Sequence, residues 1–497
     1  MSPIRALRGT LTYRLTSGAV GSFHPRNFPA VARRNYATEL RAMTMLSVGR
    51  AVIEGSILGV IVKLAYTGVV PEGRLNIGVA VIAGIPAMAN VLSFVWARLS
   101  HGRNKLRFLV GLAIAMLACG LTLAAAPRSE FGLWMTAASV GGAWVCWSGF
   151  ALIRTTIWRR NYPRAVRARI TGKLATVQIL VLGVLGLGLG VLMGDGVAKA
   201  CAEVGWTEGA ERLSLAAFGV EPLDVFRVFV VVSCLVGLVG ALMLKKLHVR
   251  QQRRLMEDER GDPAQRGGPT LNPFGVFGLL FQDSRYGVYQ LCQMTLGAAN
   301  LATVPLLPIV LKDRFDVGYL EGILLNQVLQ VVLVPVFIPV WARLLDRVHV
   351  IRFRAYHSWV FVVVLGVLVA GIALESRALL YGSSLLKGVA MAGGMLAWQL
   401  GHHDFAPPHK ANQYMGVHVS LTGLRGIVAP LVGAAAYTAL EASRPGSGVW
   451  AFAGSLVVCV FGALGFNALA LAWRRVWPEQ TTDQEASTIE PSTTLRS

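Results

Sequence analysis

The chain has 497 residues, of which 54% are hydrophobic and 15% charged, and its mean hydropathy is +0.55. A soluble protein of this length could not keep so much apolar surface away from water, so the composition excludes a soluble globular protein and predicts a membrane protein. The formal net charge is +21. The basic residues lie in short segments between apolar runs, which indicates membrane topology rather than a nucleic-acid partner.

Residues 1–41 are rich in arginine and contain no acidic residue before Glu39. This composition predicts an irregular, basic N-terminal tail on the cytoplasmic side of the membrane. A targeting segment has a similar composition and is the alternative interpretation.

Apolar runs of about 20 residues then follow, each long enough to span a bilayer as a helix. We expect twelve spanning helices in two sets of six, and therefore two bundles at 42–244 and 282–475 joined by a cytoplasmic linker at 245–281. Its polar part, residues 245–273, is expected to hold at most one short helix, and residues 476–497 are expected to be a disordered cytoplasmic tail. The expected helices are 42–66, 76–96, 106–126, 131–153, 173–193, 225–244, 286–310, 318–340, 354–374, 379–400, 414–437 and 449–473.

Lys and Arg are concentrated in alternate loops, which sets the expected orientation. The tail, the linker and the loops near residues 98–107, 159–173 and 343–354 carry most of the basic residues, whereas the loops on the other side carry few. Because positively charged loops are retained in the cytoplasm, both termini are predicted to be cytoplasmic and the protein to lie in the cell inner membrane.

One stretch occurs twice in the chain. FVWARLSHGRNKLRF at 94–108 matches PVWARLLDRVHVIRF at 339–353 at a constant offset of 245 residues. In both places a short basic turn separates two apolar runs, which indicates one structural unit used in each half. The positions that are identical in the two copies include Val95, Trp96, Ala97, Arg98, Leu99, Arg107 and Phe108.

This architecture resembles the major facilitator superfamily (MFS) of secondary transporters. The family's loop signature has a small residue, three intervening positions and then Asp-Arg; the second copy keeps Ala342, Asp346 and Arg347, whereas the first has His101 in place of the aspartate. The resemblance implies an all-α fold of two pseudo-symmetric six-helix bundles and a cytoplasmic gating role for these turns. The residues concerned are Arg98, His101, Lys105, Arg343, Asp346 and Arg347.

Charged residues inside the first expected helix form the first candidate site. Arg50 and Glu54 are four residues apart and therefore share one helix face, where they can pair. A charge at mid-membrane is costly without a partner or water, so Glu54 is a candidate for proton coupling. A static structural pair is the alternative.

In the second half, polar and basic residues suggest a lining for a substrate cavity. Arg425 and His418 lie on one face of the eleventh helix, and Lys387 lies on the tenth, where its long side chain could instead reach the surface. The seventh helix carries a polar stripe, for which hydrogen bonding between helices is the alternative explanation: Gln290, Gln293 and Asn300. The same two readings apply to Asn326, Gln327 and Gln330 on the eighth helix.

These observations predict a secondary active transporter that moves a small anionic or amphiphilic solute by alternating access, with a proton or another ion as coupling partner and lipids around it. A drug or lipid efflux pump and a non-transporting scaffold or sensor are the alternatives. No enzyme signature, cofactor site or catalytic residue is expected. The cluster WQLGHHD, Trp398–Asp404, is expected to end a helix rather than bind metal, and Arg154 is expected to anchor a helix at the membrane surface.

Overall fold

The computed structural model describes residues 21–194, 219–261, 273–406 and 411–476. Within these residues every regular element is helical, and twelve helices are long and apolar enough to cross a membrane. The all-α fold with twelve spanning helices predicted from the sequence is therefore confirmed. The predicted tail at 476–497 falls almost wholly outside the described residues.

The first half is formed by six spanning segments, of which two are interrupted. The first spanning segment consists of two helices, and the second passes through a short 3-10 turn at Ala89–Leu92. In chain order the helices are α3 (Ala30–Ala51), α4 (Gly55–Tyr66), α5 (Glu72–Met88), α6 (Ser93–Ser100), α7 (Lys105–Leu121), α8 (Glu130–Asn161), α9 (Arg164–Met193) and α12 (Pro222–Met243).

The second half repeats the six-segment pattern, and one of its segments is also irregular. The eighth span begins as α16 (Tyr319–Ile323), continues through a π-helical turn called η8 (Leu324–Val328) and ends as α17 (Leu329–Leu345). The remaining helices are α15 (Ser284–Phe315), α18 (Val350–Ala373), α19 (Arg377–Leu400), α20 (Ala411–Ser443) and α21 (Val449–Val476).

The predicted boundary of the N-terminal tail is wrong, because α3 begins at Ala30 rather than near residue 42. The early part of this helix has its own apolar contacts: Ala32 and Tyr36 are buried against Phe28 and the segment that begins α9, including Tyr162 and Ile170. Tertiary burial therefore extends the helix through a stretch whose composition is that of a basic tail.

Among the described residues of 245–273 there is one short α-helix, and a second α-helix begins at Pro273. The helix α13 (Gln252–Gly261) packs on the first half, and α14 (Pro273–Gln282) packs on α15 and α20. The sequence of α14, PFGVFGLLFQ, is apolar, so it gains more from burial against the second half than from exposure as a loop.

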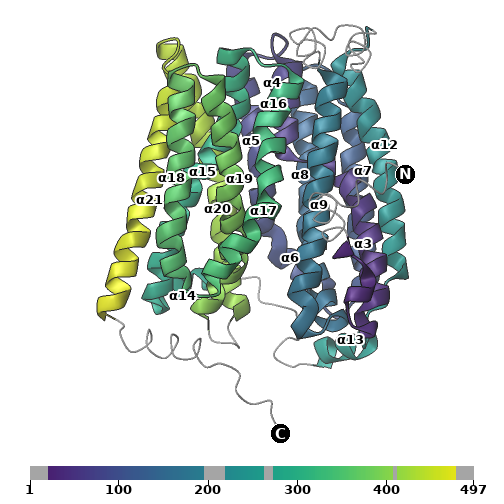
Figure 1. Cartoon of the computed structure of the whole chain (residues 1–497). Helices are drawn as coiled ribbons and strands as arrows, with labels where there is room; N and C mark the ends of the chain where they lie inside the picture. The colour runs from purple at the N-terminus through teal and green to yellow at the C-terminus, as the bar shows by residue number, and fades with distance from the viewer. Residues whose placement is uncertain (1–20, 195–218, 262–272, 407–410, 477–497) are drawn as a thin grey trace, which may run out of the picture.

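The two bundles stand side by side, with α13 and α14 at the same end of the molecule (Figure 1). We call this the linker end and its opposite the far end. Glycines allow close helix contact within and between the bundles: the α-carbon of Gly237 lies 3.1 Å from where a Cβ would stand on Gly49, and the Gly426 carbonyl oxygen lies 2.6 Å from that position on Gly84.

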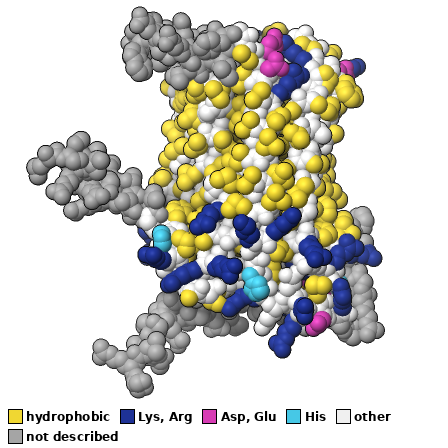
Figure 2. Space-filling view, turned by 90° about the vertical axis from the view of Figure 1, so that its right-hand side faces the viewer, with side chains coloured by type: hydrophobic (Ala, Val, Ile, Leu, Met, Phe, Trp, Pro, Cys, Tyr) yellow, Lys and Arg dark blue, Asp and Glu magenta, His cyan; other side chains and the backbone are white. Residues whose placement is uncertain are grey.

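The side chains on the surface form bands. Figure 2 shows hydrophobic side chains over the long body of the first half, and Lys and Arg gathered below them toward the linker end. A hydrophobic belt bordered by basic residues is the surface expected of a protein that spans a bilayer.

Candidate functional site

The first spanning segment is broken where the candidate pair lies. Arg50 is in the last turn of α3, and Glu54 stands directly before α4. Arg50 Nη2 lies 2.9 Å from Glu54 Oε2, and the two side chains remain 14% and 17% exposed. The contact predicted from the spacing is present, and both side chains that make it are partly exposed.

Two tryptophans of α8 complete this part of the site. The Arg50 guanidinium lies over the rings of Trp144 and Trp147, 5.1 Å and 5.0 Å from their centroids. Trp144 Nε1 also donates a hydrogen bond of 2.8 Å to the Ile53 carbonyl oxygen, which the helix break leaves without its usual helical partner. The sequence analysis did not identify either tryptophan as a site residue. Their position in the middle of a span, rather than at its ends, could have indicated a role inside the bundle.

Arg425 lies in the second half, where it is 9% exposed. Its Nη1 donates a hydrogen bond of 2.7 Å to the Gln293 carbonyl oxygen on α15. Gly297 makes this possible, because a Cβ there would stand 2.0 Å from the same nitrogen. Two turns earlier on α20, His418 Nδ1 lies 3.2 Å from Gln290 Oε1. The structure thus brings four of the predicted site residues together in two neighbouring contacts between α15 and α20.

Several buried polar atoms around Arg425 have no protein partner within the described residues. They include the Nε atoms of Arg425 and of Arg354, an α18 residue that is 2% exposed. Neither arginine forms an ion pair with an acidic side chain in the part of the chain that is described. The other such atoms are Gln290 Nε2, Gln293 Oε1 and His418 Nε2. This region therefore holds positive charge that no acidic side chain of the described residues pairs with, and polar atoms that those residues leave without a hydrogen-bond partner.

Lys387 and Asn300 meet at a small cavity between α15, α18 and α19, together with Thr303, Ser383 and Ser384. The cavity has a volume of about 10 Å³, which is room for about one water molecule. Lys387 makes no hydrogen bond or ion pair with the residues the structure describes. It therefore points into the bundle rather than to the surface.

The two halves meet through polar side chains that the sequence alone did not connect. Lys63 of α4 is 1% exposed and lies 2.8 Å from Asp313 of α15. Asn76 accepts a hydrogen bond of 2.9 Å from Lys63 Nζ and donates one of 3.2 Å to Thr438 of α20. This contact, which we call the far-end seal, joins the halves near the far end of the bundle.

A second contact between the halves lies where both have irregular backbone. Ser56, in the first turn after the break between α3 and α4, bonds to Asn326 and Gln327 of the π-helical turn η8. The third polar residue of that segment, Gln330, instead donates to the Leu325 carbonyl oxygen of its own span at 3.2 Å. Asn326 and Gln327 thus form hydrogen bonds between helices of the two halves, whereas Gln330 bonds within its own span.

Glu54 and Arg425 are not joined by any hydrogen bond or ion pair among the described residues. Glu54 pairs with Arg50 in the first half, and Arg425 bonds to Gln293 in the second. The candidate site consists of one group of charges in each half.

The first repeated turn is held by the linker helix. Lys105 Nζ lies 2.8 Å from Glu259 Oε2 of α13, and the same oxygen accepts a hydrogen bond of 2.6 Å from the Gly102 backbone N–H. His101 Nε2 lies 2.7 Å from the Glu259 carbonyl oxygen. Lys105 thus meets the carboxylate of Glu259 and His101 its backbone carbonyl oxygen, both from outside their own turn, whereas Arg98 is exposed.

In the second repeated turn, Arg343, Asp346 and Arg347 are exposed. The carboxylate that caps the following helix is Asp404, whose Oδ2 accepts a hydrogen bond of 2.8 Å from the Val350 backbone N–H. Burial lowers the pKa of His349, and the Asp404 carboxylate partly opposes this shift. Asp404 thus acts at a helix end, and no group of metal ligands occurs among the described residues.

The predicted surface role of Arg154 is wrong. Arg154 is 6% exposed, and its Nε lies 2.7 Å from Glu39 Oε1. The same carboxylate accepts hydrogen bonds of 2.7 Å from Trp158 Nε1 and 2.6 Å from the Tyr162 hydroxyl. Burial and the nearby Glu39 raise the pKa of Tyr162, which keeps its phenol protonated as the donor. The prediction failed because Glu39 was assigned to the tail.

A family model described as "Major Facilitator Superfamily" matches residues 56–430. The chain belongs to the Major Facilitator Superfamily. As an MFS transporter it is expected to move a solute, and the family and fold give no indication of an enzyme. No curated protein sequence matches the chain.

Solved structures show the same fold at low sequence identity. The chain is similar to the nucleoside transporter NupG (14% identity, 86% of this chain and 98% of that chain covered, TM-score 0.60). It is also similar to a bacterial homologue of the human lysosomal transporter Spinster in an inward-facing, unoccupied conformation (14% identity, 89% of this chain and 98% of that chain covered, TM-score 0.60). A third similar structure is the xylose transporter XylE from E. coli in an inward-open conformation (13% identity, 87% of this chain and 94% of that chain covered, TM-score 0.55).

Proposed function

We propose that this MFS transporter moves a small anionic solute across the inner membrane by alternating access, and that proton binding at Glu54 drives the cycle. The observation that carries the proposal is the charge balance inside the bundle. In the second half, Arg354, Arg425 and Lys387 lie in spanning helices without an acidic partner among the described residues. A carboxylate or phosphate group on the solute would offset the cost of burying these cations.

In the proposed cycle, the Glu54 carboxylate alternates between binding a proton and forming the ion pair with Arg50. Protonation removes the negative charge that holds Arg50, so the guanidinium becomes available to the solute, and deprotonation restores the pair. The partial exposure of both side chains supports this role, because a fully sealed pair could not exchange a proton with water. The linker end is assigned to the cytoplasm because basic residues gather there (Figure 2).

The proton step is tested by Glu54→Gln in proteoliposomes with an imposed pH gradient. Glutamine keeps the shape of the side chain but cannot ionise, so gradient-driven uptake of the solute should fall to background while the protein still folds. The matched control is Glu130→Gln, which removes one partner of the exposed Arg74–Glu130 pair and should leave transport unchanged. Full activity of the Glu54→Gln variant would remove Glu54 from the mechanism.

The solute class is tested by thermal stabilisation of the purified protein against a panel of carboxylates, phosphates, neutral sugars and amines. Anions should raise the melting temperature of the wild type, and Arg425→Gln should reduce that rise. Stabilisation by neutral or cationic compounds alone would contradict the proposed anion. Because this binding assay does not depend on a pH gradient, it separates failure of the solute assignment from failure of the proton step.

A further inference from the structure

A groove on the outside of the first half is not used by the transport cycle proposed above. It is formed where α6 ends and α7 begins, at the linker end, and has a volume of about 590 Å³. This volume is within the usual range for small-molecule sites, about 300 to 1,000 Å³. Its lining is mostly apolar with basic residues at the edge: Trp96, Leu99, Arg103, Asn104, Arg107, Phe108, Gly111 and Leu112.

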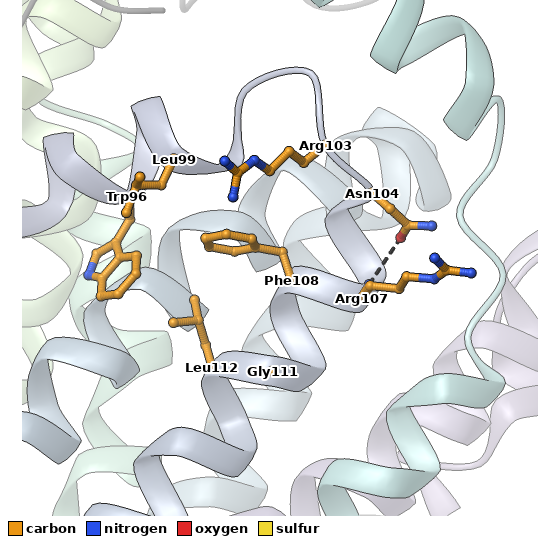
Figure 3. A pocket seen from close by; sticks show the side chains of 8 residues that line it. All are labelled: Trp96, Leu99, Arg103, Asn104, Arg107, Phe108, Gly111 and Leu112. Carbon is orange, nitrogen blue, oxygen red and sulfur yellow. Dashed lines mark hydrogen bonds between the residues drawn. The ribbon is translucent and has the colours of Figure 1, made fainter.

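The apolar part of the groove is a floor with open space above it. Trp96, Phe108 and Leu112 point toward one another across the groove (Figure 3), and the Trp96 and Phe108 rings meet edge to face with centroids 6.2 Å apart. A Cβ built on Gly111 would meet nothing within 4 Å. Leu99 at the rim is 41% exposed. Such a surface suits a flexible hydrocarbon chain better than it suits water.

The charged edge of the groove carries only positive charge. Arg103 extends over the floor toward Leu99, and Arg107 flanks Phe108 on its other side, beside Asn104 (Figure 3). Neither guanidinium forms a hydrogen bond or ion pair with the residues that the structure describes, and both side chains are exposed. The nearby Glu259 is already occupied by Lys105 and the Gly102 N–H.

The second half provides an internal comparison. At the offset of 245 residues, Arg103 corresponds to Val348 and Gly111 corresponds to Tyr356, whose side chain is 63% exposed. The second half thus lacks the Arg103 cation and carries a large side chain in place of Gly111, whereas Arg352 matches Arg107, and Trp341 and Phe353 keep the same edge-to-face packing. Arg103 and Gly111 are therefore additions to the shared unit rather than requirements of it.

We propose that this groove binds an acidic phospholipid. Its phosphate would lie against Arg103, with Arg107 as a second nearby cation, and one acyl chain would cover Trp96, Phe108 and Leu112. The place in the membrane fits this occupant, because the groove lies beside the turn between α6 and α7 that contacts α13 at the linker end, and Lys and Arg gather toward that end below the hydrophobic belt (Figure 2). Basic residues at this level attract the headgroups of anionic lipids.

Native mass spectrometry of the full-length protein measures the retained lipid directly. Protein purified from mixed micelles of phosphatidylglycerol and phosphatidylcholine should retain phosphatidylglycerol preferentially. Arg103→Gln should weaken this retention about five-fold, and Arg107→Gln should weaken it less. The control Arg343→Gln/Arg347→Gln removes two exposed charges from the second repeated turn and should leave retention unchanged.

Gly111→Tyr separates a lipid from a free phosphate. This substitution gives the floor the side chain found at Tyr356 while both arginines stay in place, so lipid retention should be lost; inorganic phosphate bound at Arg103 would be unaffected by it. Melting curves of each variant check that the fold is kept. Equal retention of the two lipids, undiminished retention in Arg103→Gln or Gly111→Tyr, or an equal loss in the control would each overturn the proposal.

Discussion

The two copies of the repeated unit, residues 94–108 and 339–353, have the same framework but different surroundings. In each copy the tryptophan Nε1 donates a hydrogen bond of 2.9 Å to a helix carbonyl oxygen, from Trp96 to Val145 and from Trp341 to Val389. Around the turns, however, the stabilising carboxylate comes from different places: Glu259 of the linker helix in the first half and Asp404 after α19 in the second. The identical tryptophan and phenylalanine pack in the same way in both copies, whereas the carboxylates that hold the turns differ between the halves.

The largest difference between the copies should appear when their carboxylates are removed. Glu259→Ala leaves the Lys105 ammonium, whose side chain is 4% exposed, without its partner, and should cost about 3 kcal/mol of unfolding free energy. Asp404→Ala removes only a helix cap and should cost about 1 kcal/mol. Reversible denaturation in detergent micelles measures both. Glu257→Ala, on the exposed side of α13, is the control and should change stability by less than about 0.5 kcal/mol. Equal costs for Glu259→Ala and Asp404→Ala would refute the proposed difference.

Because the two tryptophans make the same contacts, loss of either N–H donor should lower the unfolding free energy by the same amount, which is intermediate between the other effects described here. Trp96→Phe and Trp341→Phe keep the ring contacts but lose the N–H donor, and each should cost about 1 kcal/mol in the same denaturation assay. Trp450→Phe, at a side chain that is 66% exposed, serves as the control and should have no effect. If one copy lost about 2 kcal/mol more than the other, the two units would not share their packing.

The smallest effect concerns the open floor of the groove. Gly111→Ala adds a Cβ into free space within a helix and should stabilise the protein by about 0.5 kcal/mol, because alanine loses less backbone entropy on folding than glycine. Gly149→Ala is the opposite case, since its Cβ would lie 2.7 Å from the Trp96 ring and should lower the melting temperature. A loss of stability in Gly111→Ala would mean that another group fills the groove.

The fold could be predicted because its signal is local. Each apolar run is long enough to define its own span, and the constant offset of 245 residues showed that the halves are related. The Arg50–Glu54 contact was predictable for the same reason, since helical spacing alone brings the two side chains together. The break between α3 and α4 was not, because the hydrogen bond from Trp144 that supports it comes from 91 residues away in the chain.

The contacts between halves and with the linker required the tertiary structure. Lys63 and Asp313 each lie near the end of an apolar span, where a charged residue usually faces water. Glu259 lies in a polar linker, and no local pattern connects it to Lys105. Arg154 was misassigned because its partner Glu39 was placed outside the first helix. The sequence pattern thus carries no signal for the long-range partner of a single charged residue.

The far-end seal has a consequence for how the molecule would open on that side. The ammonium of Lys63 is almost completely excluded from solvent and is held by Asp313 of the other half. Pulling the helices apart would leave the Asp313 carboxylate without Lys63, and Lys63 with Glu72 of its own half, 3.9 Å away, as its remaining carboxylate. Unless water entered at the same moment this would be strongly unfavourable, because a buried ion without a close counter-ion is costly. The separation of the helices and the entry of water at the far end must therefore occur together, so opening there is cooperative rather than gradual.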